Sequence, residues 1–299
     1  TRLVRDWSSD VCSSDLRKHD ILLVKYNSGG SKQWLQQFGS SNNDMGLEVN
    51  VDSKGNIYVT GYTEGGLDGK TNSGERDIFL VKYNSSGTKQ WTQQLGTPTF
   101  EEGNGVAVDS SDNIYVTGWT RGKLDTYAGG DDAILVKYNS SGTKQWTRQF
   151  GAPSFLEKSK YSSSSQMTTS EDKGIGVAVD SSGNIYVTGN TDGGLDGNTN
   201  SGKNDIFLVK YNSSGVKQWT KQLGSSGSET GQGVTVDSSN NIYVTGGTTG
   251  GLDGNTRSGS GDLFLVKYNS SGTKQWTQQF GTSSNDNGYG VTVDSSNNL

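Results

Sequence analysis

The chain has 299 residues, a formal net charge of −5 and an apolar fraction of 29%. The acidic balance argues against a basic nucleic-acid-binding surface, and no stretch reaches the roughly 18 consecutive apolar residues of a membrane-spanning helix. Short β-branched and aromatic runs alternate with segments rich in Ser, Gly, Asn and Asp, a pattern that argues against disorder and predicts many short strands joined by turns.

The N-terminal residues 1–19 differ from the rest of the chain. Residues 6–16, DWSSDVCSSDL, do not recur later and resemble the translation of a common sequencing adapter. We interpret residues 1–19 as a sequencing-adapter artefact with a disordered lead-in and leave them out of the fold. The alternative is a genuine polar tail. Cys12 is the only cysteine, so no disulfide or cysteine-based zinc site is expected in residues 20–299.

Residues 20–299 are predicted to form one repeat array. Two markers, the Trp of a KQW motif and the Asp before a Ser-rich turn, return about every 57 residues, which strongly indicates a repeat protein. The Trp positions are Trp34, Trp91, Trp146, Trp219 and Trp276, and the Asp positions are Asp52, Asp109, Asp180, Asp237 and Asp294. One insertion, near residues 152–173, is expected to lie in a loop.

Each repeat is expected to hold four strands, A to D. Residues 105–109 are an example of strand A, 114–118 of strand B, 77–83 of strand C and 89–96 of strand D. The run Ile78–Val81 is apolar throughout, which is typical of a strand buried on both faces. Such a meander cannot bury both faces of its own sheet, so the repeats must stack, and a β-propeller is the simplest arrangement.

The motifs DIFLVKYNSSGTKQW and GVAVDSSGNIYVTG together resemble the SBBP family of bacterial β-propeller repeats. The resemblance covers residues 20–299 apart from the insertion. It implies an all-β propeller of four-stranded antiparallel blades, in bacterial proteins that are often secreted or surface-exposed, without a shared enzymatic activity. The sequence holds four full blades, preceded by strands C and D and followed by strand A, so we expect an incomplete ring.

The connections between strands differ at the two ends of a blade. The A–B and C–D turns are short and uniform, whereas the B–C and D–A connections are long, varied and acidic, as in residues 64–76 and 97–105. The insertion, with Glu157, Glu171 and Asp172, belongs to the second set. Because function on such scaffolds concentrates in variable loops, we expect the B–C/D–A loop face to bind the partner.

Residues suited to catalysis are few. His19 is the only histidine, so a Ser-His-Asp triad is excluded within the repeats. The recurring Asp residues, such as Asp52, and the Asn residues of the NSS triplets, such as Asn84, are interpreted as turn formers. The recurring Lys residues of strand C, such as Lys82, are expected to lie over tyrosine rings with their ammonium groups in water.

One loop has a pattern of oxygen ligands that is similar to a calcium loop. Asp196, Asn198 and Asn200 stand at alternate positions, with Asp205 further on. The glycine of the loop, Gly202, is not at the sixth position, and no Glu follows at the twelfth. We therefore predict an Asx-rich turn, with calcium binding at these four residues as the alternative.

These observations predict a non-enzymatic scaffold without a cofactor. We expect it at the bacterial surface or outside the cell, where its B–C/D–A loop face would bind a protein or glycan partner rather than nucleic acid or a membrane interior. A first alternative is a fragment of a carbohydrate-active propeller enzyme, with a non-repeated carboxylate such as Glu101, Glu102 or Glu157 in its site. A second alternative is a structural spacer in an adhesin.

Overall fold

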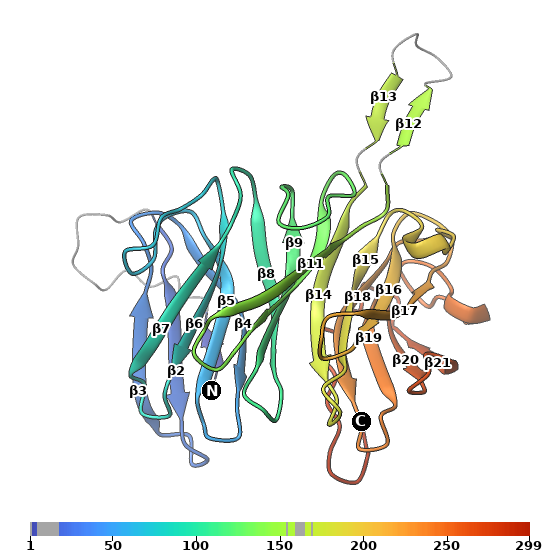
Figure 1. The fold of residues 1–299 in the computed structure, drawn as a ribbon. Coiled ribbons are helices and arrows are strands. Elements are labelled where there is room, and N and C mark those ends of the chain that lie inside the picture. The colour runs from blue at the N-terminus through green and yellow to red at the C-terminus, as the bar shows by residue number, and fades with distance from the viewer. Residues whose placement is uncertain (1, 5–17, 154, 159–164, 169) are drawn as a thin grey trace. The chain divides into compact units, whose positions relative to one another are not determined.

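The computed structural model describes residues 2–4, 18–153, 155–158, 165–168 and 170–299, and these residues form an all-β structure (Figure 1). Four four-stranded sheets and one three-stranded sheet contain all the recurring strands, and in each sheet the spatial order of the strands follows the chain. Each four-stranded sheet is a blade of the predicted kind. The adapter-like residues 6–16 lie outside the described residues, so their interpretation stays a prediction.

The three-stranded sheet precedes the four blades, and the insertion adds a separate hairpin. The three-stranded sheet holds β1 (Arg2–Val4), β2 (Ile21–Tyr26) and β3 (Lys32–Phe38). The first blade holds β4 (Asp44–Val51), β5 (Ile57–Thr63), β6 (Asp77–Tyr83) and β7 (Lys89–Leu95). The second holds β8 (Glu101–Val108), β9 (Ile114–Thr120), β10 (Asp132–Tyr138) and β11 (Lys144–Phe150). The third holds β14 (Asp172–Val179), β15 (Ile185–Thr191), β16 (Asp205–Tyr211) and β17 (Lys217–Leu223). The fourth holds β18 (Glu229–Val236), β19 (Ile242–Thr248), β20 (Asp262–Tyr268) and β21 (Lys274–Phe280). The hairpin holds β12 (Phe155–Lys158) and β13 (Ser165–Thr168), and two short 3₁₀ turns are η1 (Leu195–Gly197) and η2 (Leu252–Gly254).

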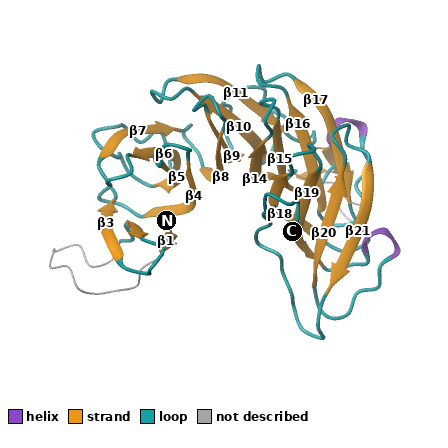
Figure 2. Cartoon of the chain, turned by 90° about the horizontal axis from the view of Figure 1, so that it is seen from below, coloured by secondary structure: helices purple, strands orange, loops and turns teal. Residues whose placement is uncertain are grey.

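The burial of the strands follows the predicted gradient. All seven residues of β5, of β9 and of β15 are buried, whereas the outer strand β7 starts with two exposed residues. The strands of a blade lie side by side as one meander, as Figure 2 shows for β18 to β21. Strands B and C therefore take the apolar runs of the sequence, and strand D carries the alternating pattern.

Three segments differ from the sequence-based expectation. Strand A begins four residues early, as in β8, because a β-bulge between Gly103 and Gly105 lets Glu101 and Glu102 join the ladder although the local sequence lacks strand formers. Residues 2–4 form β1 along β2 instead of a disordered lead-in, since the edge of β2 offers free backbone groups. The strand A expected after the fourth blade, where residues 291–299 repeat the start of the motif, is not formed, and no strand B pairs with these residues within the part of the chain that the structure describes.

The chain divides into two compact units, Thr1–Leu124 with Val136–Gln145, and Asp125–Leu135 with Trp146–Leu299. In each unit the core lies between neighbouring sheets. In the first unit, Leu23 of the three-stranded sheet packs in one cluster with Val59 and Phe79 of the next blade. In the second, Leu208 packs in one cluster with Val244 and Phe264 of the following blade. Stacking of repeats is thus what buries the apolar faces. No helix among the described residues is long and apolar enough to span a membrane.

Candidate functional site

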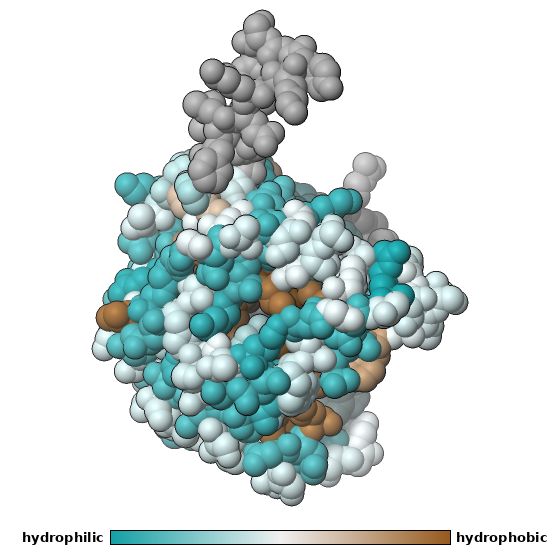
Figure 3. Space-filling view, turned by 90° about the vertical axis from the view of Figure 1, so that its right-hand side faces the viewer, coloured by the Kyte–Doolittle hydropathy of each residue, from teal (hydrophilic) through white to brown (hydrophobic). Residues whose placement is uncertain are grey.

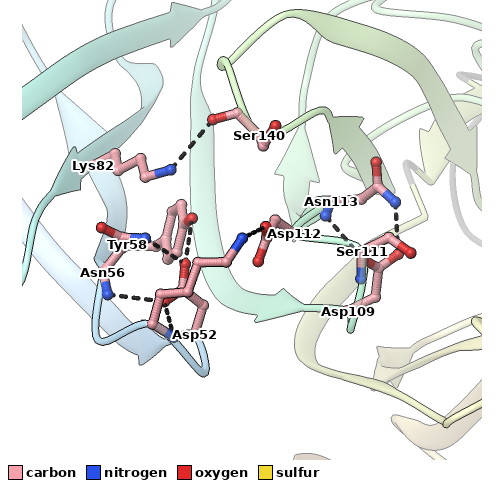
Figure 4. A network of polar contacts seen from close by, with 10 residues as sticks. Asp52, Asn56, Tyr58, Lys82, Asp109, Ser111, Asp112, Asn113 and Ser140 are labelled. Atoms are coloured by element: carbon pink, nitrogen blue, oxygen red, sulfur yellow. Dashed lines mark hydrogen bonds and ion pairs between the residues drawn. The ribbon is translucent and has the colours of Figure 1, made fainter.

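The recurring Asp of the A–B turn acts as a turn cap, as predicted. One oxygen of Asp52 accepts the backbone N–H groups of Lys54 (2.9 Å) and Asn56 (2.8 Å). The other oxygen accepts the Asn56 amide (2.8 Å) and the Tyr58 hydroxyl (3.0 Å). Burial opposes ionisation of Asp52, but these hydrogen bonds outweigh it and hold its pKa below the ordinary value. The contacts with Asn113 repeat this pattern at Asp109 (Figure 4), and the Tyr115 hydroxyl also donates to Asp109, so both carboxylates are used by the fold.

The C–D turn holds neighbouring blades together. Asn84 accepts the N–H groups of Ser86 and Thr88, which confirms its predicted role as a turn former. The ammonium of Lys82 lies 5.2 Å from the centre of the Tyr58 ring, as predicted, and donates to the Ser140 carbonyl of the next blade (Figure 4). This end of the blades is therefore made of repeated contacts that stabilise the array.

The four calcium-candidate residues each have a partner within the protein. Asp196 stands in a left-handed conformation (φ 51°), and its carboxylate pairs with Lys217 at 2.5 Å. Asn198 donates to the Leu195 carbonyl (2.7 Å), and Asn200 accepts the N–H of Gly202 (2.8 Å).

Asp205 accepts the N–H of Ser201 and the amide of Gln222, both at 2.9 Å. Among the described residues no group of three or more His, Cys, Asp or Glu side chains could hold a metal ion. These contacts support the interpretation of this segment as an Asx-rich turn, and calcium binding stays an untested alternative.

The repeated acids at the B–C/D–A end are buried and hold its loops in place. Glu101, at the start of β8, accepts the N–H of Thr97 (2.6 Å) and the hydroxyl of Thr120 (2.8 Å). Equivalent carboxylates begin every strand A and every strand C of the four blades. They are Asp44, Asp77, Glu101, Asp132, Asp172, Asp205, Glu229 and Asp262, each at most 1% exposed. Much of the acidity of these segments is therefore interior and does not face a partner.

One oxygen of each strand-C aspartate lacks a hydrogen bond. Within the part of the chain that the structure describes, these are the Oδ1 atoms of Asp77, Asp132, Asp205 and Asp262. Each lies against the glycine that directly follows strand D: a Cβ on Gly224 would come within 1.9 Å of Asp205 Oδ1. Asp172 has an unpartnered Oδ1 as well, and burial raises its pKa to about 6. In Asp172 this burial favours the protonated form.

Positions that vary between the repeats gather at this same end. Tyr62, at the end of strand B, is replaced by Trp119, Asn190 and Gly247 in the other blades. It pairs across the sheet with Met45, as Trp119 pairs with Glu102. In an array whose turns and cores repeat almost unchanged, these substitutions distinguish one blade from another.

In the first unit the variable positions form one cluster of aromatic and charged side chains, here called the Arg76 cluster. Its members are Tyr62, Glu64, Arg76, Phe100, Glu102, Trp119 and Arg121. Arg76 donates to Glu102 (2.6 Å) and to Glu64 (3.3 Å), and its guanidinium lies 4.2 Å from the centre of the Tyr62 ring. The Trp119 indole donates to the second Glu102 oxygen at 3.2 Å.

The surface of this cluster is provided by Phe100 and Arg121. Phe100 is half-buried, Arg121 is exposed, and the guanidinium of Arg121 lies 5.2 Å from the Phe100 ring. Sequence reasoning did not single out Arg76, Tyr62 or Phe100. The signal that could have found them is their departure from the repeat, since a side chain that differs at an otherwise regular position is not required by the fold.

Two of the three carboxylates named in the enzyme alternative, Glu101 and Glu102, take part in contacts within the protein. Glu101 is fully buried and occupies the place of Glu229, so it belongs to the repeated clamps and is not unique. Glu102 is paired with Arg76. Glu157 belongs to β12, and its side chain is not among the parts of the chain that the structure describes. Glu171, an acid of the insertion that the enzyme alternative does not include, is largely exposed and pairs with Lys173.

The comparisons with known proteins agree with this architecture. The model of the SBBP family, a β-propeller repeat, matches residues 33–68, 90–124, 145–196, 218–253 and 275–299. An uncharacterized WD repeat-containing protein of Acanthamoeba polyphaga mimivirus is 25% identical over 92% of this chain and 19% of its own length. The regulatory protein FlaEY of Caulobacter vibrioides is 26% identical over 49% of this chain and 17% of its own length. The chain thus spans about a fifth of the length of these curated relatives.

A solved structure was also found. A protein of unknown function from Bacteroides caccae covers 90% of this chain and 98% of its own, with 12% identity and a TM-score of 0.31. At that score the likeness carries no argument, and the fold rests on the strands, sheets and repeats described above.

Proposed function

This chain belongs to the SBBP family of β-propeller repeats, and from that premise we propose that it is a non-enzymatic scaffold whose B–C/D–A loop face binds a protein or glycan partner. The Arg76 cluster is the centre of the proposed binding face in the first unit. The observation that carries the proposal is the gathering of the non-repeated side chains at this end of the blades. Folding alone does not require the side chains at these positions to differ from one blade to the next.

The chemistry of the Arg76 cluster supports this role. Tyr, Trp and Arg are the residues enriched at the energetic centres of binding interfaces, because they combine a large contact area with few rotatable bonds or with several fixed donors. Aromatic faces also provide stacking surfaces for sugar rings. The ion pairs from Arg76 to Glu64 and Glu102 hold the aromatic side chains in one arrangement before a partner arrives, which lowers the entropy cost of binding.

The relatives support an interaction role in coarse terms only. One is a WD repeat-containing protein and the other a regulatory protein, and neither title names a substrate. We further propose a location at the bacterial surface or outside the cell. This proposal is supported by the resemblance described for the repeat motifs and by a composition rich in polar turn residues, with Cys12 as the only cysteine.

A comparison of face variants tests the proposed function. The chain is immobilised and incubated with a glycan array and with an extract of the source organism, and captured molecules are identified. Arg76→Ala and Arg121→Ala remove the two cations of the cluster, and Lys54→Ala removes an exposed cation at the opposite end of the blades. A partner lost from the two cluster variants and kept by Lys54→Ala supports the proposal. A partner kept equally by all three contradicts the assignment of the face.

The same preparation separates the two alternatives. Polysaccharide cleavage that disappears in Glu102→Gln would favour the enzyme. No capture of any glycan or protein by the wild-type chain would favour the spacer.

A further inference from the structure

The first residue after strand B normally accepts a hydrogen bond from the D–A connection that enters the same blade. In three blades the pairs are Glu64 with the Asn43 amide, Asp192 with the Glu171 N–H and Thr249 with the Ser228 N–H, each at 2.8 Å. In the second blade this residue is Arg121, whose guanidinium has no acceptor atom. Arg121 therefore cannot make the contact that the repeat makes here, and folding gives no reason for a cation at this position.

The guanidinium of Arg121 is held instead by aromatic rings. It lies 5.2 Å from the centre of the Phe100 ring and 5.9 Å from that of Trp119. The backbone N–H of Arg121 donates to the Phe100 carbonyl at 3.0 Å. Arg121 is exposed all the same. A cation that rests on aromatic rings keeps its charge at the surface and loses little side-chain entropy when a partner binds.

A second exposed cation, Lys123, follows two residues later. The other three blades have glycine at this place in the sequence, namely Gly66, Gly194 and Gly251. Lys123 makes no hydrogen bond or ion pair within the part of the chain that the structure describes. The fold therefore does not require this lysine either, and of the four blades only the second carries two cations in this segment.

The backbone between the two cations is fixed. The N–H of Gly122 donates to the Thr120 hydroxyl at 3.0 Å. A Cβ on Gly122 would stand 2.0 Å from the Thr97 hydroxyl oxygen, so this segment lies directly against the D–A connection. Because residues 121 and 123 are two apart, their Cα atoms lie no more than about 7 Å from each other. The result is a pair of adjacent cations on a rigid support, here called the Arg121–Lys123 pair.

Burial decides which class of partner suits the Arg121–Lys123 pair. Tyr62 and Trp119 are each only 8% exposed, and Arg121 itself lies over the Phe100 ring. A sugar ring would therefore find little aromatic face on which to stack. On the side of the molecule that Figure 3 shows, the apolar residues are few and lie among hydrophilic ones, so apolar contacts are scarce there as well. Charge complementarity is what the Arg121–Lys123 pair offers to a partner.

We propose that the Arg121–Lys123 pair binds the carboxylates of an acidic, extended segment of a protein partner. This inference rests on the proposed function of the B–C/D–A loop face and specifies the chemistry of its partner. Alternate residues of an extended strand point to the same side and are about 7 Å apart, which matches the spacing of the two cations. The guanidinium can bind one carboxylate with two parallel hydrogen bonds, and the ammonium binds the next as a point charge.

The acidic balance of the whole chain does not prevent such a contact. The net charge of −5 repels an acidic partner at long range, but salt at physiological strength screens exposed charges beyond about 8 Å. The acids of the Arg76 cluster, Glu64 and Glu102, are engaged in ion pairs with Arg76. The cations of the Arg121–Lys123 pair therefore determine the local attraction.

Titration of the full chain with a short labelled peptide of alternating Asp and Thr, followed by fluorescence anisotropy, tests the proposal. The wild-type chain is expected to bind the peptide, and more weakly as NaCl is raised from about 50 to about 300 mM. Arg121→Gln and Lys123→Gln should each weaken binding by roughly fivefold, and the double variant by about 25-fold if the two cations act independently. Because Lys123 has no partner among the described residues, a loss of binding in Lys123→Gln does not reflect unfolding.

Lys70→Gln is the matched control, because it removes an exposed cation from the B–C connection of the first blade. It should bind the peptide like the wild type. A peptide that the wild-type chain does not bind, or that all variants bind equally, overturns the proposal. Polygalacturonate, an anionic glycan, is titrated in parallel, and tighter binding of this probe than of the peptide overturns the choice of a protein segment.

The same variants separate this inference from the proposed function. A captured partner that is lost from Arg76→Ala and kept by Lys123→Gln would overturn the inference and leave the binding face in place. A partner kept by Arg76→Ala, Arg121→Ala and Lys54→Ala alike would contradict the binding face, whatever the peptide titration shows. In the doubly reversed variant, Arg121→Glu with Lys123→Glu, a peptide of alternating Lys and Thr should bind in place of the acidic one.

Discussion

The Cα of Gly215 lies directly against the indole of Trp146, so that a Cβ at this position would stand 2.9 Å from Cε2 of the ring. Gly215 also has a positive φ of 75°, as the turn requires. The glycine of the NSSG turn therefore serves its own turn and the preceding repeat at once. This explains why the turn and the KQW motif recur together through the sequence.

Replacement of Gly215 by Ala should destabilise the protein through both the turn and the indole contact, and a control glycine separates the two costs. The left-handed backbone costs about 1–2 kcal/mol for any residue with a Cβ, and the clash with Trp146 should add about 1–3 kcal/mol. Gly197→Ala is the matched control, because its φ is 83° and nothing lies within 4 Å of the added Cβ. Urea unfolding should show a larger loss of stability for Gly215→Ala. Equal losses would mean that the indole contact contributes nothing.

Replacement of the turn-capping Asp237 by Ala or by Asn should lower the free energy of unfolding. Its carboxylate accepts four hydrogen bonds, among them those from the Asn241 amide and the Tyr243 hydroxyl. Asp237→Ala removes all four and should lower the free energy of unfolding by about 3 kcal/mol, since unsatisfied buried groups cost about 1–3 kcal/mol each. Asp237→Asn keeps one acceptor oxygen and should lie between Ala and wild type. Thermal unfolding that ranks Asn below Ala would refute this reading of the turn.

Asp172 should make the protein more stable at mildly acidic pH than at neutral pH. Burial raises its pKa from 3.8 to about 6, so the folded chain keeps this proton where the unfolded chain has lost it. The free energy of unfolding should therefore fall as the pH rises from about 4 to about 6, by on the order of 2 kcal/mol.

Asp172→Asn tests this pH dependence with a neutral side chain of the same shape. Its oxygen can still accept the N–H of Ala152. Denaturant titrations at several pH values should show wild type and variant converging near pH 4, with the variant more stable at pH 7. A constant difference across this range would contradict the pKa argument.

The contribution of Asp196 to stability should come from its ion pair with Lys217 and not from bound calcium. Burial opposes its ionisation, but the hydrogen bonds from Lys217 and Thr220 outweigh burial and hold the pKa of Asp196 below its ordinary value. Asp196→Asn tolerates the left-handed backbone and removes the charge, so it should cost roughly 0.5–1 kcal/mol, as exposed ion pairs do. Saturating calcium should leave the melting temperature of both proteins unchanged. A calcium-dependent rise that is lost in Asp196→Asn would establish the calcium site.

Local patterns were sufficient to predict the blades. The all-apolar run of β6, the alternation of β7 and the Ser-Gly turns between them each depend on residues that are neighbours in the sequence. The roles of Asp52 and Asn84 were predictable for the same reason, since their side chains bond the backbone within four residues. The early start of β8 was missed, because its bulge depends on the partner strand β9.

The sequence alone therefore determined the repeat, the four strands of each blade and the turn chemistry, because these depend on short-range periodicity and hydrogen bonding. Only the tertiary structure decided that Glu101 is buried in a loop clamp while Arg76 lies half-buried among aromatic rings. The physical reason is the same in each case: the deciding contacts come from a neighbouring strand or a neighbouring repeat, which the spacing of residues in one repeat does not reveal.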